Sequence, residues 1–151
     1  MAEDFYPMPS FVTLSVADVS ASASWYQSVL GFRVVFTMPG PGGGVVLAHL
    51  RLARYADLLL VAARAPVPLP RGAGVQLNFT LGDRTVDDLA THARSQWGRV
   101  EGPVTQPWNA REVYVIDPDG YRLAFIQQAN AGLGIQDVVD NVSSAPEPRD
   151  H

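Results

Sequence analysis

Apolar and polar positions along the chain follow two periods, which predict strands and helices in a fixed order. Alternation with a period of two predicts a strand from Phe11 to Val16, and apolar residues three or four positions apart predict a helix from Val19 to Leu30. Asp18 is a suitable helix N-cap, and Gly31 suits the position just past the helix end. Three more strands are predicted over residues 32–38, 45–52 and 58–63, with residues 53–57 as a short turn.

The same β-α-β-β-β pattern begins again after a stretch rich in proline and glycine. Residues 65–74 contain alternating prolines followed by glycines, which predicts a stiff linker. Asp83 is then expected to open a helix that runs to Trp97. Asp117-Pro118-Asp119-Gly120 predicts the turn of a hairpin. The strands predicted for this part cover residues 75–81, a short stretch near 104, residues 111–116 and residues 121–127.

The two halves superpose at an offset of 65 residues, which places Phe11 on Gln76, Asp18 on Asp83 and Leu59 on Ala124. This repeat predicts a βαβββ module over residues 10–64, the linker over 65–74, a second βαβββ module over 75–128 and a C-terminal tail over 129–151. Neither module can bury its sheet alone, so we expect one α+β domain with a cupped, barrel-like mixed sheet and helices outside. In the tail, residues 135–139 are apolar enough to dock, and residues 143–151 have a disordered composition.

Composition narrows the class of protein. The 151 residues are 47% hydrophobic and 17% charged, which is typical of a globular domain. The absence of cysteine excludes disulfides, thiolate metal sites and cysteine nucleophiles. All basic residues are scattered arginines and the net charge is −4, which argues against a nucleic-acid partner. No apolar run is long enough for a membrane span, and the acidic beginning of the sequence is unlike a secretory signal, so we expect a cytoplasmic protein.

Three motifs resemble a known family. The stretches FVTLSVAD (residues 11–18) and WYQSVLGF (residues 25–32) resemble the opening of the vicinal-oxygen-chelate superfamily, and PWNAREVYVIDPDG (residues 107–120) resembles its closing signature. This superfamily includes glyoxalase I, fosfomycin-resistance enzymes, extradiol dioxygenases and bleomycin-resistance proteins. The resemblance covers residues 10–128 and implies the same duplicated fold.

The resemblance also implies where a metal would bind. Metal-dependent members carry donors at the start of the first strand and within the last strand of a half, and these positions correspond here to Phe11, Leu59, Gln76 and Ala124. A divalent metal needs three or four converging donors, whereas only Gln76 offers one. We therefore expect no metal and no other cofactor. Among the histidines, only His49 lies within a predicted strand, where it lines the pocket or lies on the outer sheet face.

A cup without metal ligands suits a small-molecule host, and we assign no catalytic residue. In bleomycin-resistance proteins an aromatic residue near the loop of Trp108 stacks on flat ligand rings, which implies a stacking role for this residue. Arg111 and Glu112 are expected to pair at the strand start. The predicted ligand-binding residues are the aromatic Phe11, Phe36, Phe79, Trp108 and Tyr114 and the polar His49, Gln76, Asn78 and Glu112.

Three functions remain open at this point. The first is a metal-independent binding protein, expected to form a homodimer, that sequesters an antibiotic or another planar natural product. The second is a metal-free biosynthetic enzyme, such as an isomerase, cyclase or lyase, with His49 or Glu112 as acid or base. The third is a metal-dependent enzyme of the glyoxalase or dioxygenase type with relocated ligands. A change in ligand mass would favour the second function, and stoichiometric metal would favour the third.

Overall fold

The computed structural model describes residues 5–66, 68 and 71–147. Both halves have the predicted element order β-α-β-β-β, and the α+β class is confirmed. The first half consists of β1 (Val12–Val16), α1 (Val19–Trp25), η2 (Tyr26–Leu30), β2 (Arg33–Pro39), β3 (Val45–Ala53) and β4 (Ala56–Ala62). The second half consists of β5 (Gln76–Thr80), α2 (Val86–Ser95), β6 (Arg99–Gln106), β7 (Ala110–Ile116) and β8 (Arg122–Gln128), and α3 (Ile135–Ser144) follows it.

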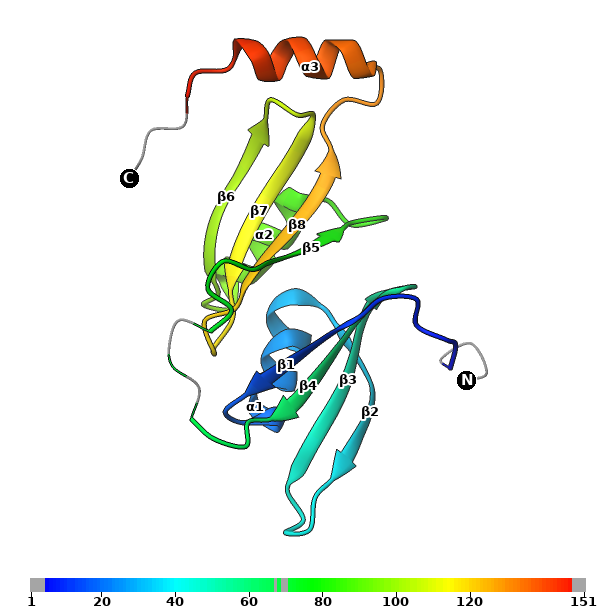
Figure 1. Ribbon diagram of the computed structural model, residues 1–151, viewed down its shortest axis with the longest axis vertical. Coiled ribbons are helices and arrows are strands. Elements are labelled where there is room, and N and C mark those ends of the chain that lie inside the picture. Colours follow the sequence, from blue (N-terminus) through cyan, green and yellow to red (C-terminus); the bar gives the residue numbers. More distant parts are fainter. Residues whose placement is uncertain (1–4, 67, 69–70, 148–151) are drawn as a thin grey trace.

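Each half forms its own four-stranded mixed sheet. The strand orders are β1-β4-β3-β2 and β5-β8-β7-β6, and in each sheet the first strand runs parallel to its neighbour while the others are antiparallel. Figure 1 shows the two sheets one above the other, with α1 and α2 on their far side. No hydrogen-bonded ladder joins the two sheets within the described part of the chain, so the sheet is not one continuous barrel.

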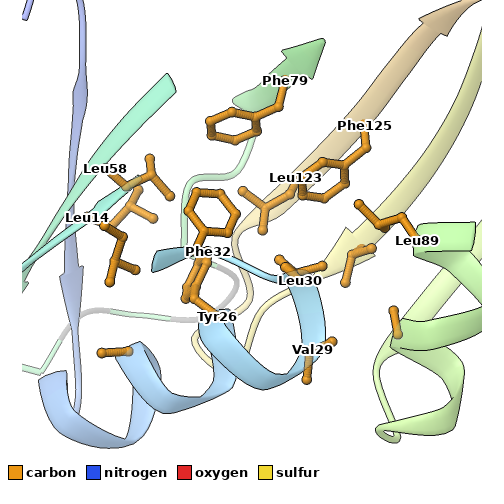
Figure 2. Packing of buried hydrophobic residues seen from close by; sticks show 14 of the residues in the cluster. Leu14, Tyr26, Val29, Leu30, Phe32, Leu58, Phe79, Leu89, Leu123 and Phe125 are labelled. Carbon is orange, nitrogen blue, oxygen red and sulfur yellow. The ribbon is translucent and has the colours of Figure 1, made fainter. Parts of the chain in front are cut away.

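One hydrophobic core extends through both modules on the helix side of the sheets. Tyr26 and Leu30 from η2 and Leu89 from α2 are buried between the sheets and the helices (Figure 2). A series of rings joins the modules: the Phe32 and Phe79 centroids lie 5.5 Å apart, and Phe79 stacks on Phe125 at 5.7 Å. Because neither module closes this core by itself, their relative position is fixed by apolar packing.

The first helix follows its prediction and the second does not. Asp18 is the N-cap of α1 and accepts from the Ala21 amide, and Gly31 ends η2 in the left-handed conformation. The second helix is capped by Thr85, whose Oγ1 accepts from the Asp88 amide over 3.1 Å, so the prediction that Asp83 opens it is wrong. It also ends before Trp97, which is left-handed and 94% exposed. The reason is a closing turn in which the Gly98 amide donates to the Ala93 carbonyl.

The turn between β3 and β4 is shorter than predicted. Tyr55 adopts a positive φ of 67°, which reverses the chain within two residues. Asp57 therefore belongs to β4 and is not a turn residue.

The linker and the tail show contacts and a helix that the sequence did not predict. Within the linker, Arg71 is buried and donates to the Ser15 carbonyl and to Asp119, whereas residues 67, 69 and 70 lie outside the described part. Helix α3 buries no residue within this chain, so the docking of residues 135–139 stays a prediction. Helix α3 also continues to Ser144, beyond the predicted start of disorder; Asp137 caps its first turn by accepting from the Gly134 amide. Residues 148–151 lie outside the described range.

Candidate functional site

Each sheet turns one face toward the helices, and the other face carries most of the candidate residues. Leu14, Leu50 and Leu58 are buried on the helix side of the first sheet, and their neighbours along each strand point to the opposite side because side chains alternate. We call this opposite side the open face. The strand register aligns one row of residues across each open face: Phe36, His49, Leu59 and Thr13 in the first sheet, and Glu101, Tyr114, Ala124 and Asn78 in the second.

The two rows are equivalent, because each residue of the second row lies 65 positions after its counterpart in the first. The register thus repeats with the offset that the sequence pattern indicates. The side chains do not repeat: His49 corresponds to Tyr114, and Phe36 corresponds to Glu101. One backbone arrangement therefore presents two chemically different open faces.

On the second open face, Trp108, Glu112 and Tyr114 form one hydrogen-bonded group. The Trp108 indole Nε1 donates to Glu112 Oε1 over 3.0 Å, and the Tyr114 hydroxyl donates to the other carboxylate oxygen. Burial, followed by the hydrogen bond to Glu112, raises the pKa of Tyr114 above its ordinary value, so this phenol is a donor at neutral pH. Trp108 remains 48% exposed, which leaves aromatic surface for a ligand.

Arg122 connects this group to Gln76 and Asn78. Its guanidinium lies over the Tyr114 ring at 4.4 Å, and its Nε donates to Gln76 Oε1 over 3.0 Å. Gln76 Nε2 in turn donates to Asn78 Oδ1 over 2.9 Å. The structure thus joins five of the predicted ligand-binding residues through one polar network on a single sheet face.

The first open face buries a charged cluster of His49, Arg51 and Asp57. His49, Arg51 and Asp57 are only 5%, 6% and 3% exposed, respectively. Arg51 Nε donates to Asp57 Oδ1 over 2.7 Å, and His49 Nε2 contacts the same oxygen at 2.8 Å. The Tyr6 hydroxyl donates to Asp57 Oδ2 over 2.8 Å. Burial raises the pKa of Asp57, but the hydrogen bonds from Tyr6, His49 and Arg51 outweigh it and keep the pKa below its ordinary value.

A cavity of about 470 Å³ lies where the starts of β1 and β4 meet β5, and we call it the junction cavity. Its volume is in the range of small-molecule sites. Its lining includes three aromatic residues, Phe11, Tyr55 and Phe79, together with polar groups. The full set of lining residues is Ser10, Phe11, Val12, Arg54, Tyr55, Ala56, Asp57, Leu58, Gln76, Leu77, Asn78, Phe79 and Thr80.

The predicted ligand-binding residues therefore divide into groups. Phe11, Gln76, Asn78 and Phe79 all line the junction cavity, although the Phe79 ring packs into the core against Phe125. Trp108, Glu112 and Tyr114 lie farther along the second open face, outside the cavity lining. Phe36 lies on the first open face, with its ring 5.5 Å from the ring of His49 in an edge contact.

Sequence reasoning missed Tyr6, Arg51 and Asp57. Part of the signal was present, because His49 and Arg51 are two positions apart in one strand and therefore share a face. Asp57 joins them only because the β3–β4 turn is short, and Tyr6 precedes the first strand in a segment without a periodic pattern.

The predicted pairing of Arg111 with Glu112 is wrong. Arg111 donates to both carboxylate oxygens of Asp87, over 2.8 and 2.7 Å, whereas Glu112 bonds to Trp108 and Tyr114. Adjacent residues of a strand point to opposite faces, so these two side chains do not meet.

The residues at the family's metal positions do not fit a metal. Phe11, Leu59 and Ala124 have no donor atoms, and both ends of the Gln76 amide are already hydrogen-bonded within the chain. Among the described residues, no group of three or more His, Cys, Asp or Glu side chains is arranged to hold a metal ion. A divalent cation would therefore need three ligands from elsewhere.

The described helices also bear on membrane association. None of them is both long enough and apolar enough to span a bilayer.

Several solved structures are similar to this chain. A glyoxalase/bleomycin resistance protein from Streptomyces sp. CB03234 is 23% identical, with a TM-score of 0.60 over 78% of this chain and 97% of that chain. TioX from Micromonospora sp. ML1 is 22% identical, with a TM-score of 0.63 over 82% and 98% of the two chains. TnmS3, an antibiotic binding protein from Streptomyces sp. CB03234, is 22% identical, with a TM-score of 0.61 over 78% and 93%. At these identities the likeness establishes the fold.

The sequence itself gives the family. No match was found among curated proteins. The profile of the Glyoxalase/Bleomycin resistance protein/Dioxygenase superfamily, however, matches residues 9–125, which include every strand of both sheets except the end of β8. Together with the duplicated βαβββ order, this match shows that the chain belongs to the Glyoxalase/Bleomycin resistance protein/Dioxygenase superfamily.

Proposed function

We propose that this protein binds a planar organic molecule, such as an antibiotic or another natural product, without a metal and without changing the ligand chemically. Such a protein protects a cell by keeping its ligand bound. TnmS3, a chain of similar structure, is an antibiotic binding protein, which supports a binding role for this fold.

One observation carries the proposal: three of the four positions that hold a metal in metal-dependent relatives present hydrocarbon here, and a cavity of ligand size lies beside two of the four. Phe11 and Gln76 occupy two of these positions, and both line the junction cavity. The apolar side chains favour association with an apolar ligand, and the few polar groups fix its orientation.

The exposed aromatic surface of Trp108 favours a planar ligand. Its indole is held in place by Glu112, so the ring is ordered before a ligand arrives. Offset stacking on such a ring contributes about 0.5–1.5 kcal/mol beyond the burial of area. Arg122 and Tyr114 offer a second flat surface on the same open face.

Affinity mass spectrometry of the full chain against natural-product extracts tests the proposal. We expect one compound to be captured with unchanged mass and to quench tryptophan fluorescence, and we expect a chelator to leave its affinity unaltered. Trp108→Ala should weaken binding about 2- to 10-fold. The matched variant Trp97→Ala, which removes an exposed indole away from the open faces, should leave the affinity unchanged. Failure to capture any compound, or loss of binding with the chelator, would contradict the proposal.

We also propose that two copies associate. Phe36 and Met38 on β2 and Val104 on β6 are exposed apolar residues. Helix α3 adds Ile135, Val139 and Val142. A second copy that covered these groups would remove them from water. Light scattering of the purified chain should give twice the mass of one chain, and a mass of one chain at micromolar concentration would contradict association.

A second candidate function is a metal-free enzyme, and the contact between His49 and Asp57 favours it. A carboxylate that binds one nitrogen of an imidazole fixes the ring and its tautomer, which is the arrangement of many general bases. The same mass spectrometry separates the candidates, because a captured compound that changes mass on the protein identifies an enzyme.

A further inference from the structure

The segment of residues 5–11 contains no helix or strand, and its Tyr6 is bound by the charged cluster on the first open face. The Tyr6 hydroxyl donates to Asp57 Oδ2 over 2.8 Å and accepts from the Tyr55 amide over 2.9 Å. The Arg51 guanidinium lies over the ring at 4.2 Å, and the Tyr55 ring meets it edge-on at 5.1 Å. One phenol is thus recognised through its oxygen, its face and its edge.

The groups that receive the phenol are themselves held in place. Asp57 is oriented through its other oxygen by Arg51 and His49, and all three residues are buried in β3 or β4. The carboxylate is ionised because these hydrogen bonds together outweigh the effect of burial on its pKa. An ionised, fixed carboxylate is a strong acceptor for a hydroxyl donor. The side chains that bind the phenol are therefore held in position before it binds.

The segment that carries Tyr6 is held less firmly than the cluster that binds it. Tyr6 lies in an irregular segment, in which Pro7 and Pro9 have no amide hydrogen to pair with a sheet. The segment can leave without breaking a strand or a helix. Local opening of this kind has a low free-energy cost compared with opening of the core.

The place of the Tyr6 ring adjoins the junction cavity, since Tyr55 and Asp57 contact Tyr6 and also line that cavity. A molecule whose ring took the place of Tyr6 would have space for its remaining atoms beside Phe11, Gln76 and Asn78.

We infer that the ligand of this protein is a hydroxyaryl compound, that its phenolic ring binds between Arg51, Tyr55 and Asp57, and that Tyr6 is an internal competitor which occupies this place until the ligand displaces it. The inference rests on the proposed function and names its ligand class. The apparent dissociation constant then equals the intrinsic one divided by the fraction of molecules in which Tyr6 has left. If Tyr6 occupies its place about nine-tenths of the time, removing it strengthens binding about tenfold.

Fluorescence titration with 2-naphthol, a small hydroxyaryl probe, tests the inference. Tyr6→Ala should bind 2-naphthol about tenfold more tightly than the unaltered chain. 2-Methoxynaphthalene, which has the same rings without a donor hydroxyl, should bind Tyr6→Ala more weakly than 2-naphthol does, because Asp57 receives no hydrogen bond from it. Phe5→Ala removes an exposed aromatic ring from the same segment and should leave the affinity for 2-naphthol unchanged.

Tyr6→Phe provides a second measurement if Tyr6→Ala fails to fold. This variant keeps the ring and loses the hydroxyl, so its ring competes less well, and 2-naphthol should still bind more tightly than to the unaltered chain. An unchanged affinity for 2-naphthol in the folded Tyr6 variants, or equal affinities of Tyr6→Ala for the two naphthalenes, would overturn the inference. That result would leave the proposed function standing, because capture of a natural product by the unaltered chain is measured separately.

Discussion

Two aspartate clusters in this protein contain the same kinds of groups in different surroundings. In the first, Asp57 binds Arg51 and the Tyr6 hydroxyl. In the second, at the β7–β8 turn, Asp119 binds Arg71 over 2.7 Å, and its neighbour Asp117 accepts from the Tyr26 hydroxyl over 2.8 Å. Each cluster thus combines an arginine, a carboxylate and a phenol.

The element that carries the tyrosine distinguishes the two clusters. Tyr26 belongs to η2, is fully buried and packs edge-on against Phe32 at 5.3 Å, so it leaves only if the core opens. Tyr6 belongs to an irregular segment above an open sheet face. The same hydrogen-bonding chemistry therefore locks the modules together at one place and offers an exchangeable binding position at the other. The following measurements test this difference.

The largest effect is expected at the locked cluster. Asp119 binds the buried Arg71 and also accepts from the Ala17 amide, so it ties together the linker, the β7–β8 turn and the end of β1. Asp119→Ala leaves a buried guanidinium without this partner, and we expect the free energy of unfolding to fall by about 3–5 kcal/mol. Urea denaturation measures this change.

Asp87→Ala is the matched control for that measurement. It also removes a carboxylate paired with an arginine, but Arg111 and Asp87 are on the surface and water replaces the lost contact. A loss of stability as small as in this control would show that the Asp119 cluster does not lock the modules.

The two tyrosine hydroxyls give a smaller and more direct comparison. Tyr26→Phe removes a donor from the buried Asp117, and we expect a loss of about 1.5–3 kcal/mol in unfolding free energy. Tyr6→Phe should cost less than about 1 kcal/mol, because the segment of residues 5–11 can move away and admit water to Asp57. Equal losses in the two variants would mean that Tyr6 is as firmly fixed as Tyr26.

The smallest expected effect is in the pH dependence of the unfolding free energy, to which Asp57 and Asp117 contribute with opposite signs. The folded pKa of Asp57 is lowered from the ordinary 3.8, so its contribution to stability is present above this value and is lost as the pH falls through the folded pKa. Burial raises the pKa of Asp117, so its contribution is present below the ordinary value and is lost as the pH rises through the folded pKa.

Unfolding free energies measured from about pH 2.5 to pH 6 check both signs, since this range brackets the ordinary carboxyl pKa. Asp57→Asn should flatten the fall of the unfolding free energy on the acid side. Asp117→Asn should remove a fall of the unfolding free energy above about pH 4. Slopes of the same sign for the two aspartates would contradict this account.

Prediction from the sequence succeeded for the features that depend on neighbours along the chain. Asp18 caps α1 because a short acceptor precedes an apolar helical pattern, and Gly31 ends η2 because the left-handed conformation favours glycine. The strands of both halves were found because side chains alternate within them. Asp83 was misplaced because two competing cap residues lie within three positions, and the sequence does not rank Asp83 against Thr85.

Prediction of the candidate site was partial for a related reason. Gln76 and Asn78 were found together because they are two positions apart in one strand. Phe79, the next residue, packs its ring into the core although it also lines the junction cavity, because a shift of one position changes the face. Arg51 was not assigned to the site because its partners, Tyr6 and Asp57, come from a segment and a turn that carry no periodic signal.

The sequence by itself determined the order of elements, the repeat of 65 residues and the lack of donors at three of the family's four metal positions. These features are determined by residue chemistry and local backbone preference, which act within a few positions. Only the tertiary structure decided that Tyr6 meets Asp57 and that Arg71 in the linker meets Asp119. Such contacts join residues about 50 positions apart, and they form because burial of the apolar core fixes where each strand end lies.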